Sequence, residues 1–176
     1  NRFMHPDGKV RDAIGIKAEF LSMISANDAV IEGVSSIGVF AANSSIVYAS
    51  GVQVRDCGNY GVYSGNGATI QIHALEGKSS KVTGCKIGVC ARSQGAVYGS
   101  NLIVQEAEKG IYADLLGTIQ VINSEVSRCS VVAYEATKGA YIDAPGSAAK
   151  SVENKVKYSP ANSGVSGNFN ATILFS

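Results

Sequence analysis

The sequence predicts an all-β solenoid in which short parallel strands stack coil upon coil over most of the chain. Two observations lead to this fold class. A short motif recurs at an almost constant interval, and its apolar residues alternate with polar ones. A fixed period of roughly 20 to 50 residues indicates stacked repeats, and alternation with a period of two indicates strands with one buried face.

The recurring motif is clearest between Val47 and Tyr63, where the chain reads VYASGVQVRDCGNYGVY. It contains a short apolar run, a step from Val54 to Cys57, a polar corner and then Gly61-Val62-Tyr63. The valine of the step returns as Val82, Val104 and Val126, and the small residue that ends it returns as Cys85, Ala107 and Cys129. The residue after the corner recurs at intervals of 23, 23, 27, 22 and 22 residues, as Gly15, Gly38, Gly61, Gly88, Gly110 and Val132.

These intervals fit coils of three short strands better than helical repeats. A helical repeat needs about ten residues with a period of 3.6, and the chain contains no such stretch. Its alternating apolar pairs include Ile37/Val39, Ile70/Ile72 and Ile119/Val121, and Gly, Asn and Ser punctuate the runs. Leucine-rich repeats have a similar length, but their recurrent Leu and Asn frame is missing. We therefore predict about six coils of 22–23 residues between residues 14 and 149.

The period and pattern resemble the right-handed parallel β-helix of bacteriophage tailspikes and pectate-lyase-like proteins, from about Gly15 to Ala149. The likeness rests on no catalytic motif. It implies a right-handed, single-stranded β-helix on the tail of a virion, commonly a homotrimer that touches bacterial surface polysaccharide outside the cell. The resemblance also leaves two alternatives. One is an enzyme, either a polysaccharide lyase or a glycoside hydrolase, and the other is a secreted or cell-surface adhesin. We expect no cofactor.

The two ends of the chain are predicted to differ from the coils. Residues 1–13 are polar and include the turn signal Pro6-Asp7-Gly8, which predicts a linker or leading segment. Residues 150–176 lose the repeat and finish in a short apolar strand, Ala171 to Phe175. Because an open solenoid end exposes edge strands and core, we predict a C-terminal cap or oligomerisation tail there.

Two coils depart from the regular pattern. In the first coil the stretch from Glu19 to Ile24 could form a helical turn, but the register favours a strand ending at Ile24. The interval of 27 residues reflects an insertion at Leu75 to Ser79. Loops on rigid scaffolds often bind partners, which makes this loop a candidate contact site. A tolerated insertion without a function explains it equally well.

Composition argues against two classes of function. The 176 residues carry a formal net charge of +1, and their basic residues are scattered. This distribution does not suit a nucleic-acid-binding surface. No run of about 18 apolar residues is present, so we expect no transmembrane helix and no membrane insertion.

Three of the four cysteines share one position of the repeat. Cys57, Cys85 and Cys129 would lie one above another, with neighbouring coils about 4.8 Å apart. This spacing is close enough for a disulfide between Cys57 and Cys85. We predict free, buried thiols instead, and no metal site, because the spacings fit no zinc pattern.

Alternation assigns each side chain to a face of the coil. The predicted inward files are Val39, Val62, Val89, Ile111 and Ala133; Val47, Ile70, Val97 and Ile119; and Val54, Val82, Val104 and Val126. The predicted outward files are Tyr48, Gln71, Tyr98 and Gln120; and Phe40, Tyr63, Cys90, Tyr112 and Tyr134. Contiguous exposed aromatic residues mark interaction surfaces, so we predict that these tyrosines and Phe40 contact another subunit or sugar rings. A third interpretation is that the file from Phe40 to Tyr134 faces inward instead.

Four carboxylates are candidates for catalysis, although no Ser/His/Asp arrangement accompanies them. Asp56 and Glu106 occupy one slot two coils apart, at roughly 10 Å, which is marginal for a glycosidase acid pair. Glu106 and Arg128 resemble a surface ion pair. Asp114 and Glu135 lie near each other one repeat apart, where a solvated corner is the simpler interpretation. A structural and receptor-binding module is therefore the first hypothesis, and an enzyme is the second.

Overall fold

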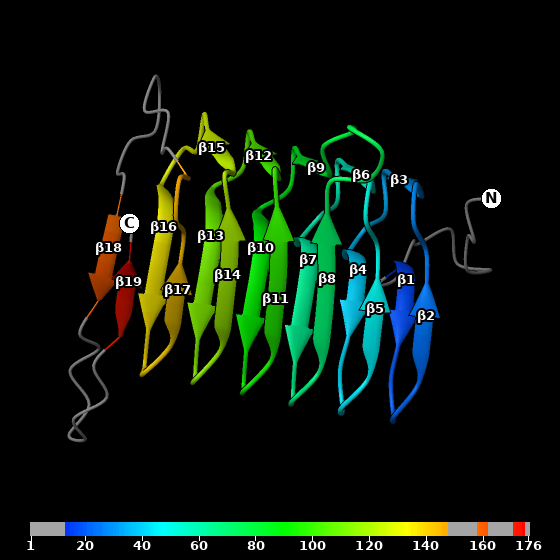
Figure 1. Ribbon diagram of the computed structural model, residues 1–176, viewed down its shortest axis with the longest axis horizontal. Helices are drawn as coiled ribbons and strands as arrows, with labels where there is room; N and C mark the ends of the chain where they lie inside the picture. The colour runs from blue at the N-terminus through cyan, green and yellow to red at the C-terminus, as the bar shows by residue number, and fades with distance from the viewer. Residues whose placement is uncertain (1–12, 148–157, 162–170, 175–176) are drawn as a thin grey trace, which may run out of the picture.

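A computed structural model confirms the all-β solenoid of about six coils (Figure 1). The structure describes residues 13–147, 158–161 and 171–174. These residues contain no helix, and so none that could cross a lipid bilayer. The predicted strand ending near Ile24 is present as β2 (Met23–Ser25). The linker predicted at residues 1–13 lies outside the described residues except for Ala13.

The first five coils each contribute one strand to each of three parallel sheets, whose strands follow the order of the chain, and strands β16 to β19 extend two of these sheets. Sheet A contains β1 (Ile14–Ala18), β4 (Ile37–Ala41), β7 (Tyr60–Gly65), β10 (Ile87–Arg92), β13 (Lys109–Asp114), β16 (Val132–Thr137) and β18 (Tyr158–Ala161). Sheet B contains β2, β5 (Ile46–Tyr48), β8 (Thr69–His73), β11 (Ala96–Ser100), β14 (Thr118–Ile122), β17 (Tyr141–Asp143) and β19 (Thr172–Leu174). Sheet C contains β3 (Val30–Glu32), β6 (Gln53–Arg55), β9 (Lys81–Thr83), β12 (Ile103–Gln105) and β15 (Glu125–Ser127).

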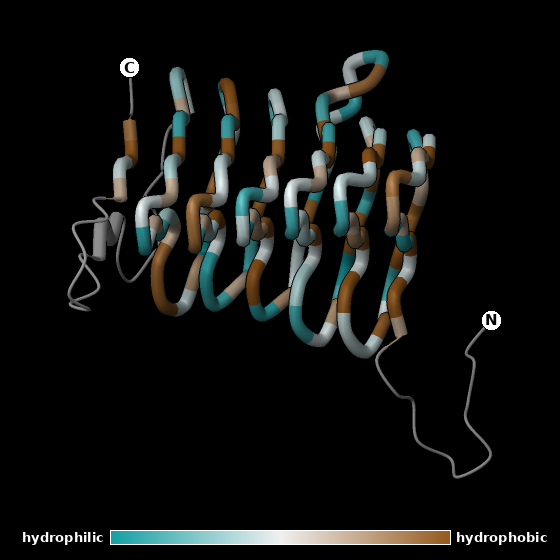
Figure 2. The backbone as a smooth tube through the Cα atoms, turned by 90° about the horizontal axis from the view of Figure 1, so that it is seen from below, coloured by the Kyte–Doolittle hydropathy of each residue, from teal (hydrophilic) through white to brown (hydrophobic). Residues whose placement is uncertain are grey.

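The core runs through the stack as continuous files of aliphatic side chains. Every member of the three predicted inward files is buried, from Val39 on sheet A to Val126 on sheet C. Figure 2 shows hydrophobic segments at equivalent places in successive coils. Each fully buried Val or Ile stabilises the fold by roughly 1.5–3 kcal/mol before entropy is subtracted, so the period of the sequence becomes the period of the core.

The corner between sheets A and B is a two-residue turn with both φ angles positive. In one coil these residues are Asn66 (φ 50°) and Gly67 (φ 71°), which suit the left-handed region. In another they are Leu115 (φ 48°) and Leu116 (φ 62°). The turn ends β13, and the N–H of Gly117 closes it by donating to the carbonyl of Asp114 at 3.0 Å. This closure fixes the backbone of Asp114 at the end of the strand.

Strand β16 has a different register from the one that the sequence pattern predicted. Between β10 and β13 the paired residues are 22 apart, as in Val89 with Ile111. Between β13 and β16 they are 23 apart, so Ile111 pairs with Tyr134 rather than with Ala133. The extra residue rotates β16 by one position relative to its expected faces. The prediction that Tyr134 points outward is therefore wrong: its side chain is in the core, with an exposed fraction of 0%.

The sheets continue beyond residue 149. Strand β18 pairs with β16 in sheet A, and β19 pairs with β17 in sheet B. The short apolar strand expected near the C-terminus is present as β19. The other residues of the predicted cap or oligomerisation tail lie outside the described part of the chain.

Candidate functional site

The outer face of sheet A carries an aromatic patch, which we define as Phe40, Tyr60, Tyr63 and Tyr112. The rings of Phe40 and Tyr63 stack on adjacent coils, with centroids 5.6 Å apart and an interplanar angle of 11°. Tyr60 packs edge-on against Tyr63 at 5.0 Å. The sequence pattern missed Tyr60, because it precedes the glycine of the motif and was assigned to the polar corner. All four side chains are half-buried.

Titration behaviour reflects how well this patch is shielded from water. Burial raises the pKa of Tyr60 and of Tyr63. Cys90 lies in register between Tyr63 and Tyr112, yet it has an exposed fraction of 0%. Burial raises the pKa of its thiol to about 12. The prediction that Cys90 belongs to the exposed file is therefore wrong, because its larger neighbours cover it.

Cations approach the rings at both ends of the patch. Lys109 Nζ lies 4.5 Å from the centroid of Tyr112 and also pairs with Glu135. At the other end, Lys17 Nζ lies 6.0 Å from the centroid of Phe40. A lysine over an aromatic face contributes roughly 0.5–1 kcal/mol at an exposed site. The patch thus has apolar rings at its centre and charged side chains at its ends.

Asp114 lies beside the aromatic patch and is almost completely buried. Its Oδ2 accepts from Arg92 Nε at 3.0 Å. Its Oδ1 accepts from Thr137 Oγ1 at 2.7 Å and lies 3.5 Å from Lys138 Nζ. The sequence suggested a solvated corner shared with Glu135, and this was wrong. The 23-residue offset brings Thr137 opposite Asp114 and leaves Glu135 with Lys109.

A second polar region is the corner groove, a shallow hollow of about 550 Å³ where sheet C turns into sheet A. One wall carries Asp56 and Glu106, which share the repeat slot that the sequence had indicated. Gly84 separates them, and a Cβ at Gly84 would lie 2.3 Å from Asp56 Oδ1. Arg128 Nη2 pairs with Glu106 Oε1 at 2.9 Å, which confirms the expected surface ion pair.

The opposite wall of the corner groove contains residues that the sequence pattern missed. Lys86 and Glu108 line this wall, each one residue beyond the small-residue file. Both are exposed. The alternation of apolar and polar residues ends at the corner. It therefore gives no reason to group Lys86 and Glu108 with Asp56.

The floor of the corner groove is formed by the small-residue file. Cys57 and Cys85 lie there, are buried, and are free thiols, as predicted. A hydrogen bond with Cys85, followed by burial, raises the pKa of Cys57 far above its ordinary value. Burial also raises the pKa of Cys129, in the same file, to about 11.

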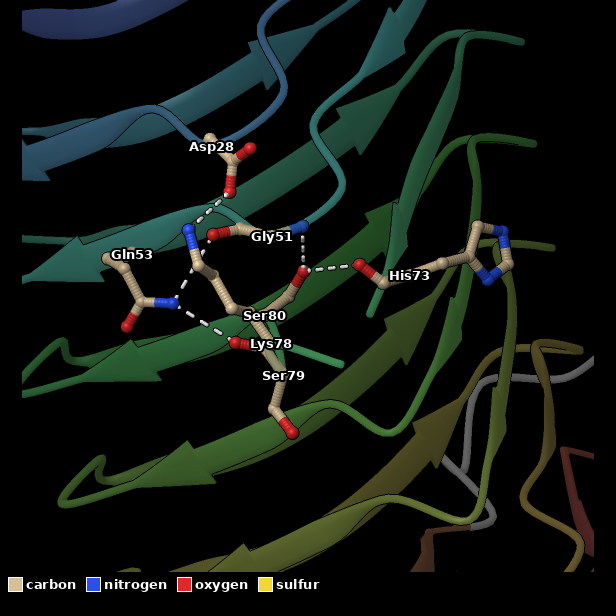
Figure 3. A network of polar contacts seen from close by, with 7 residues as sticks. All are labelled: Asp28, Gly51, Gln53, His73, Lys78, Ser79 and Ser80. Carbon is tan, nitrogen blue, oxygen red and sulfur yellow. Dashed lines mark hydrogen bonds and ion pairs between the residues drawn. The ribbon is translucent and has the colours of Figure 1, made fainter. Parts of the chain in front are cut away.

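The insertion forms a small hairpin that projects beyond sheet C (Figure 1). The backbones of Leu75 and Lys78 exchange two hydrogen bonds of 2.9 and 2.8 Å around a turn at Glu76 and Gly77. Figure 3 shows the polar network that holds its base. Ser80 Oγ accepts from the Gly51 N–H at 2.9 Å and donates to the His73 carbonyl at 2.7 Å.

Further bonds tie the hairpin to the two preceding coils. Gln53 Nε2 donates to the Ser79 carbonyl at 3.0 Å, and Lys78 pairs with Asp28 at 3.6 Å (Figure 3). These contacts attach the insertion to the solenoid through both backbone and side-chain atoms. Its role as a contact site stays a prediction.

The remaining predicted site residues lie elsewhere. Tyr48 and Tyr98 are half-buried on sheet B, in one file with Gln71 and Gln120, as predicted. They alternate with the two glutamines, so they form no continuous aromatic surface. Among the residues that the structure describes, no three His, Cys, Asp or Glu side chains are arranged to hold a metal ion.

Comparisons with protein-family models, with curated proteins and with solved structures give no significant match to this chain. The outer face of sheet A and the corner groove are therefore the two surfaces from which a function can be inferred.

Proposed function

We propose that this chain is a β-helical module of a bacteriophage tailspike-type protein, which assembles as a homotrimer and recognises a bacterial surface polysaccharide. The observation that carries the proposal is the aromatic patch on the outer face of sheet A. An apolar centre with a charged rim is the usual composition of a specific protein interface. Phe40 and Tyr63 form that centre, and ion pairs such as Arg92 with Asp114 form part of the rim.

The subunit contact is assigned to sheet A rather than to sheet B because of ring continuity. Phe40, Tyr60 and Tyr63 contact one another across two coils. Tyr48 and Tyr98 are separated by Gln71. Contiguous apolar surface marks an interaction site more specifically than isolated exposed rings do.

Sedimentation velocity at micromolar concentration tests the assembly. We expect the wild-type chain to sediment as a trimer and Tyr63→Glu to sediment as a monomer, because the variant places a charge in the apolar centre. Tyr98→Glu is the matched control, since Tyr98 is also a half-buried tyrosine on an outer strand face, and it should remain trimeric. A monomeric wild type, or equal dissociation of both variants, would contradict the proposal.

Polysaccharide recognition is tested separately, by titrating the chain with capsular and lipopolysaccharide glycans.

A second candidate function is depolymerisation, favoured by the position of Asp56 and Glu106 on one wall of the corner groove. Two coils place these carboxyls roughly 10 Å apart, close to the upper limit for an inverting acid pair. A reducing-end or absorbance assay decides this point. Activity that disappears in Glu106→Gln would rank the enzyme first.

A further inference from the structure

The buried carboxylate of Asp114 is surrounded by more positive charge than it needs. Its side chain is 2% exposed, and it contacts both Arg92 and Lys138. A buried carboxylate requires a partner, because removing it from water costs several kcal/mol. One cation would balance its charge. The second leaves this cluster with one net positive charge on the outer face of sheet A.

The contact geometry leaves the outer edge of Arg92 open. Arg92 uses Nε to reach Asp114 Oδ2 at 3.0 Å. The Arg92 side chain is 42% exposed, so part of its guanidinium group faces solvent. Lys138 contacts Asp114 through Oδ1, and its side chain is 43% exposed. Asp114 therefore orients two cations whose side chains are both partly exposed to solvent.

An arginine held in this way suits a planar oxyanion. The guanidinium presents paired N–H donors in a fixed fork that matches a carboxylate with two parallel hydrogen bonds. Because Asp114 already fixes Nε, little side-chain entropy remains to be lost on binding. One excess positive charge fits a singly charged carboxylate better than a phosphate dianion.

The surroundings favour a sugar as the carrier of that carboxylate. On strand β10, Arg92 lies two positions beyond Cys90, which is in register with Tyr63 and Tyr112. Tyr63 and Tyr112 therefore lie on the same face of sheet A, two positions along the strands from the level of Arg92. Amphipathic rings beside a charged donor provide both contact area and orientation for a ring-shaped polar ligand.

We propose that Arg92 and Lys138 bind the carboxylate of an acidic sugar, such as a uronic or sialic acid unit of a polysaccharide, and that Asp114 acts as the positioning residue. This inference rests on the proposed polysaccharide recognition and names its substrate class. The site lies on the coils that follow the Phe40–Tyr63 stack. The proposal requires that Arg92 and Lys138 stay accessible to solvent at the rim of the subunit contact.

The test is isothermal titration of the full chain with oligogalacturonate, oligoalginate and oligosialic acid, with dextran as the neutral glycan. We expect at least one acidic oligosaccharide to bind and dextran not to bind. Arg92→Gln should weaken binding at least tenfold, and Arg92→Lys should give an intermediate loss, because it keeps the charge but removes the fork. Arg55→Gln is the control, because Arg55 is an exposed arginine on sheet C outside both candidate sites, and it should change affinity less than twofold.

Circular dichroism and sedimentation velocity on the same samples separate the outcomes. Equal effects of Arg92→Gln and Arg55→Gln, or no binding of any acidic oligosaccharide, would overturn the inference. A trimer that binds neutral bacterial glycans but ignores the acidic ones would overturn it while leaving the proposed function intact. A monomer that binds no glycan at all would overturn both.

Discussion

Within the residues that the structure describes, two carboxylate–arginine pairs join the same two neighbouring coils, and they differ chiefly in burial. Asp114 meets Arg92 at 3.0 Å on sheet A, and Glu106 meets Arg128 at 2.9 Å in the corner groove. The Asp114 side chain is 2% exposed, and that of Glu106 is 59% exposed. Exposed pairs contribute roughly 0–1 kcal/mol, whereas loss of a partner from a buried pair is far more costly. Distance alone therefore does not rank the two.

The difference follows from where each carboxylate lies in the coil. Asp114 ends a strand, and Thr137 and Lys138 of the next coil reach over it. Glu106 occupies a left-handed corner (φ 57°) whose side chain projects into water. The two carboxylates therefore have different roles. Asp114 orients cations on the outer face of sheet A, whereas Glu106 is a solvated residue of the corner groove.

The largest effect on stability is expected when a carboxylate is introduced into the core, where no cation can pair with it. Val104 has an exposed fraction of 0% and pairs in register with Val82 and Val126. Val104→Asp places a charge among aliphatic side chains, and we expect it to lower the free energy of unfolding by more than about 4 kcal/mol. Urea denaturation followed by circular dichroism measures this. Thr83→Asp, on the outer face of sheet C, is the control, and a similar loss there would contradict the assignment of faces.

The next largest effect concerns the two pairs themselves. We expect Asp114→Ala to lower the free energy of unfolding by about 2–3 kcal/mol, because hydrogen bonds to a buried charge are lost. Glu106→Ala should cost less than about 1 kcal/mol and should cost less still at high salt. Chemical denaturation at two ionic strengths measures both. Equal losses would show that burial does not distinguish the pairs.

Smaller effects are expected from the buried thiols at alkaline pH. Burial raises the pKa of Cys90 from 9.0 to about 12 and that of Cys129 from 9.0 to about 11. The folded state thus retains protons that the unfolded chain loses. Stability is complete below pH 9 and falls as pH rises through the folded pKa values. At pH 10 each thiol should lower the free energy of unfolding by roughly 1 kcal/mol.

Denaturation curves at pH 7 and pH 10 measure this loss. Cys129→Ala should recover its share, and alanine already occupies the same file at Ala107. A wild-type stability that is unchanged between the two pH values would argue that these thiols are not shielded.

The sequence predicted most of the fold, because period and alternation are direct consequences of coil length and burial. Period and alternation led to the wrong register at β16, where the sequence pattern aligned Val132 with Gly110. A small residue is required in that slot, since a Cβ at Gly110 would lie 2.4 Å from Val126 Cγ1. Ala133 satisfies this requirement and Val132 does not. Side-chain size would thus have given the correct register and placed Tyr134 in the core.

The candidate sites were less predictable than the fold. Burial of Asp114 depends on long side chains from two neighbouring coils, Arg92 and Lys138, folding over it. Alternation states which face a residue occupies but not what covers that face. The pairing of Glu106 with Arg128 was predictable, because both occupy the same corner slot on adjacent coils.

Cross-strand nuclear Overhauser effects most directly test the register on which both surfaces depend. Backbone contacts should join Ala91 to Ala113, which are 22 residues apart, and Ala113 to Ala136, which are 23 apart. Contacts joining Ala113 to Glu135 instead, or none between residues one coil apart, would contradict the stacked arrangement that brings Arg92, Asp114 and Lys138 together.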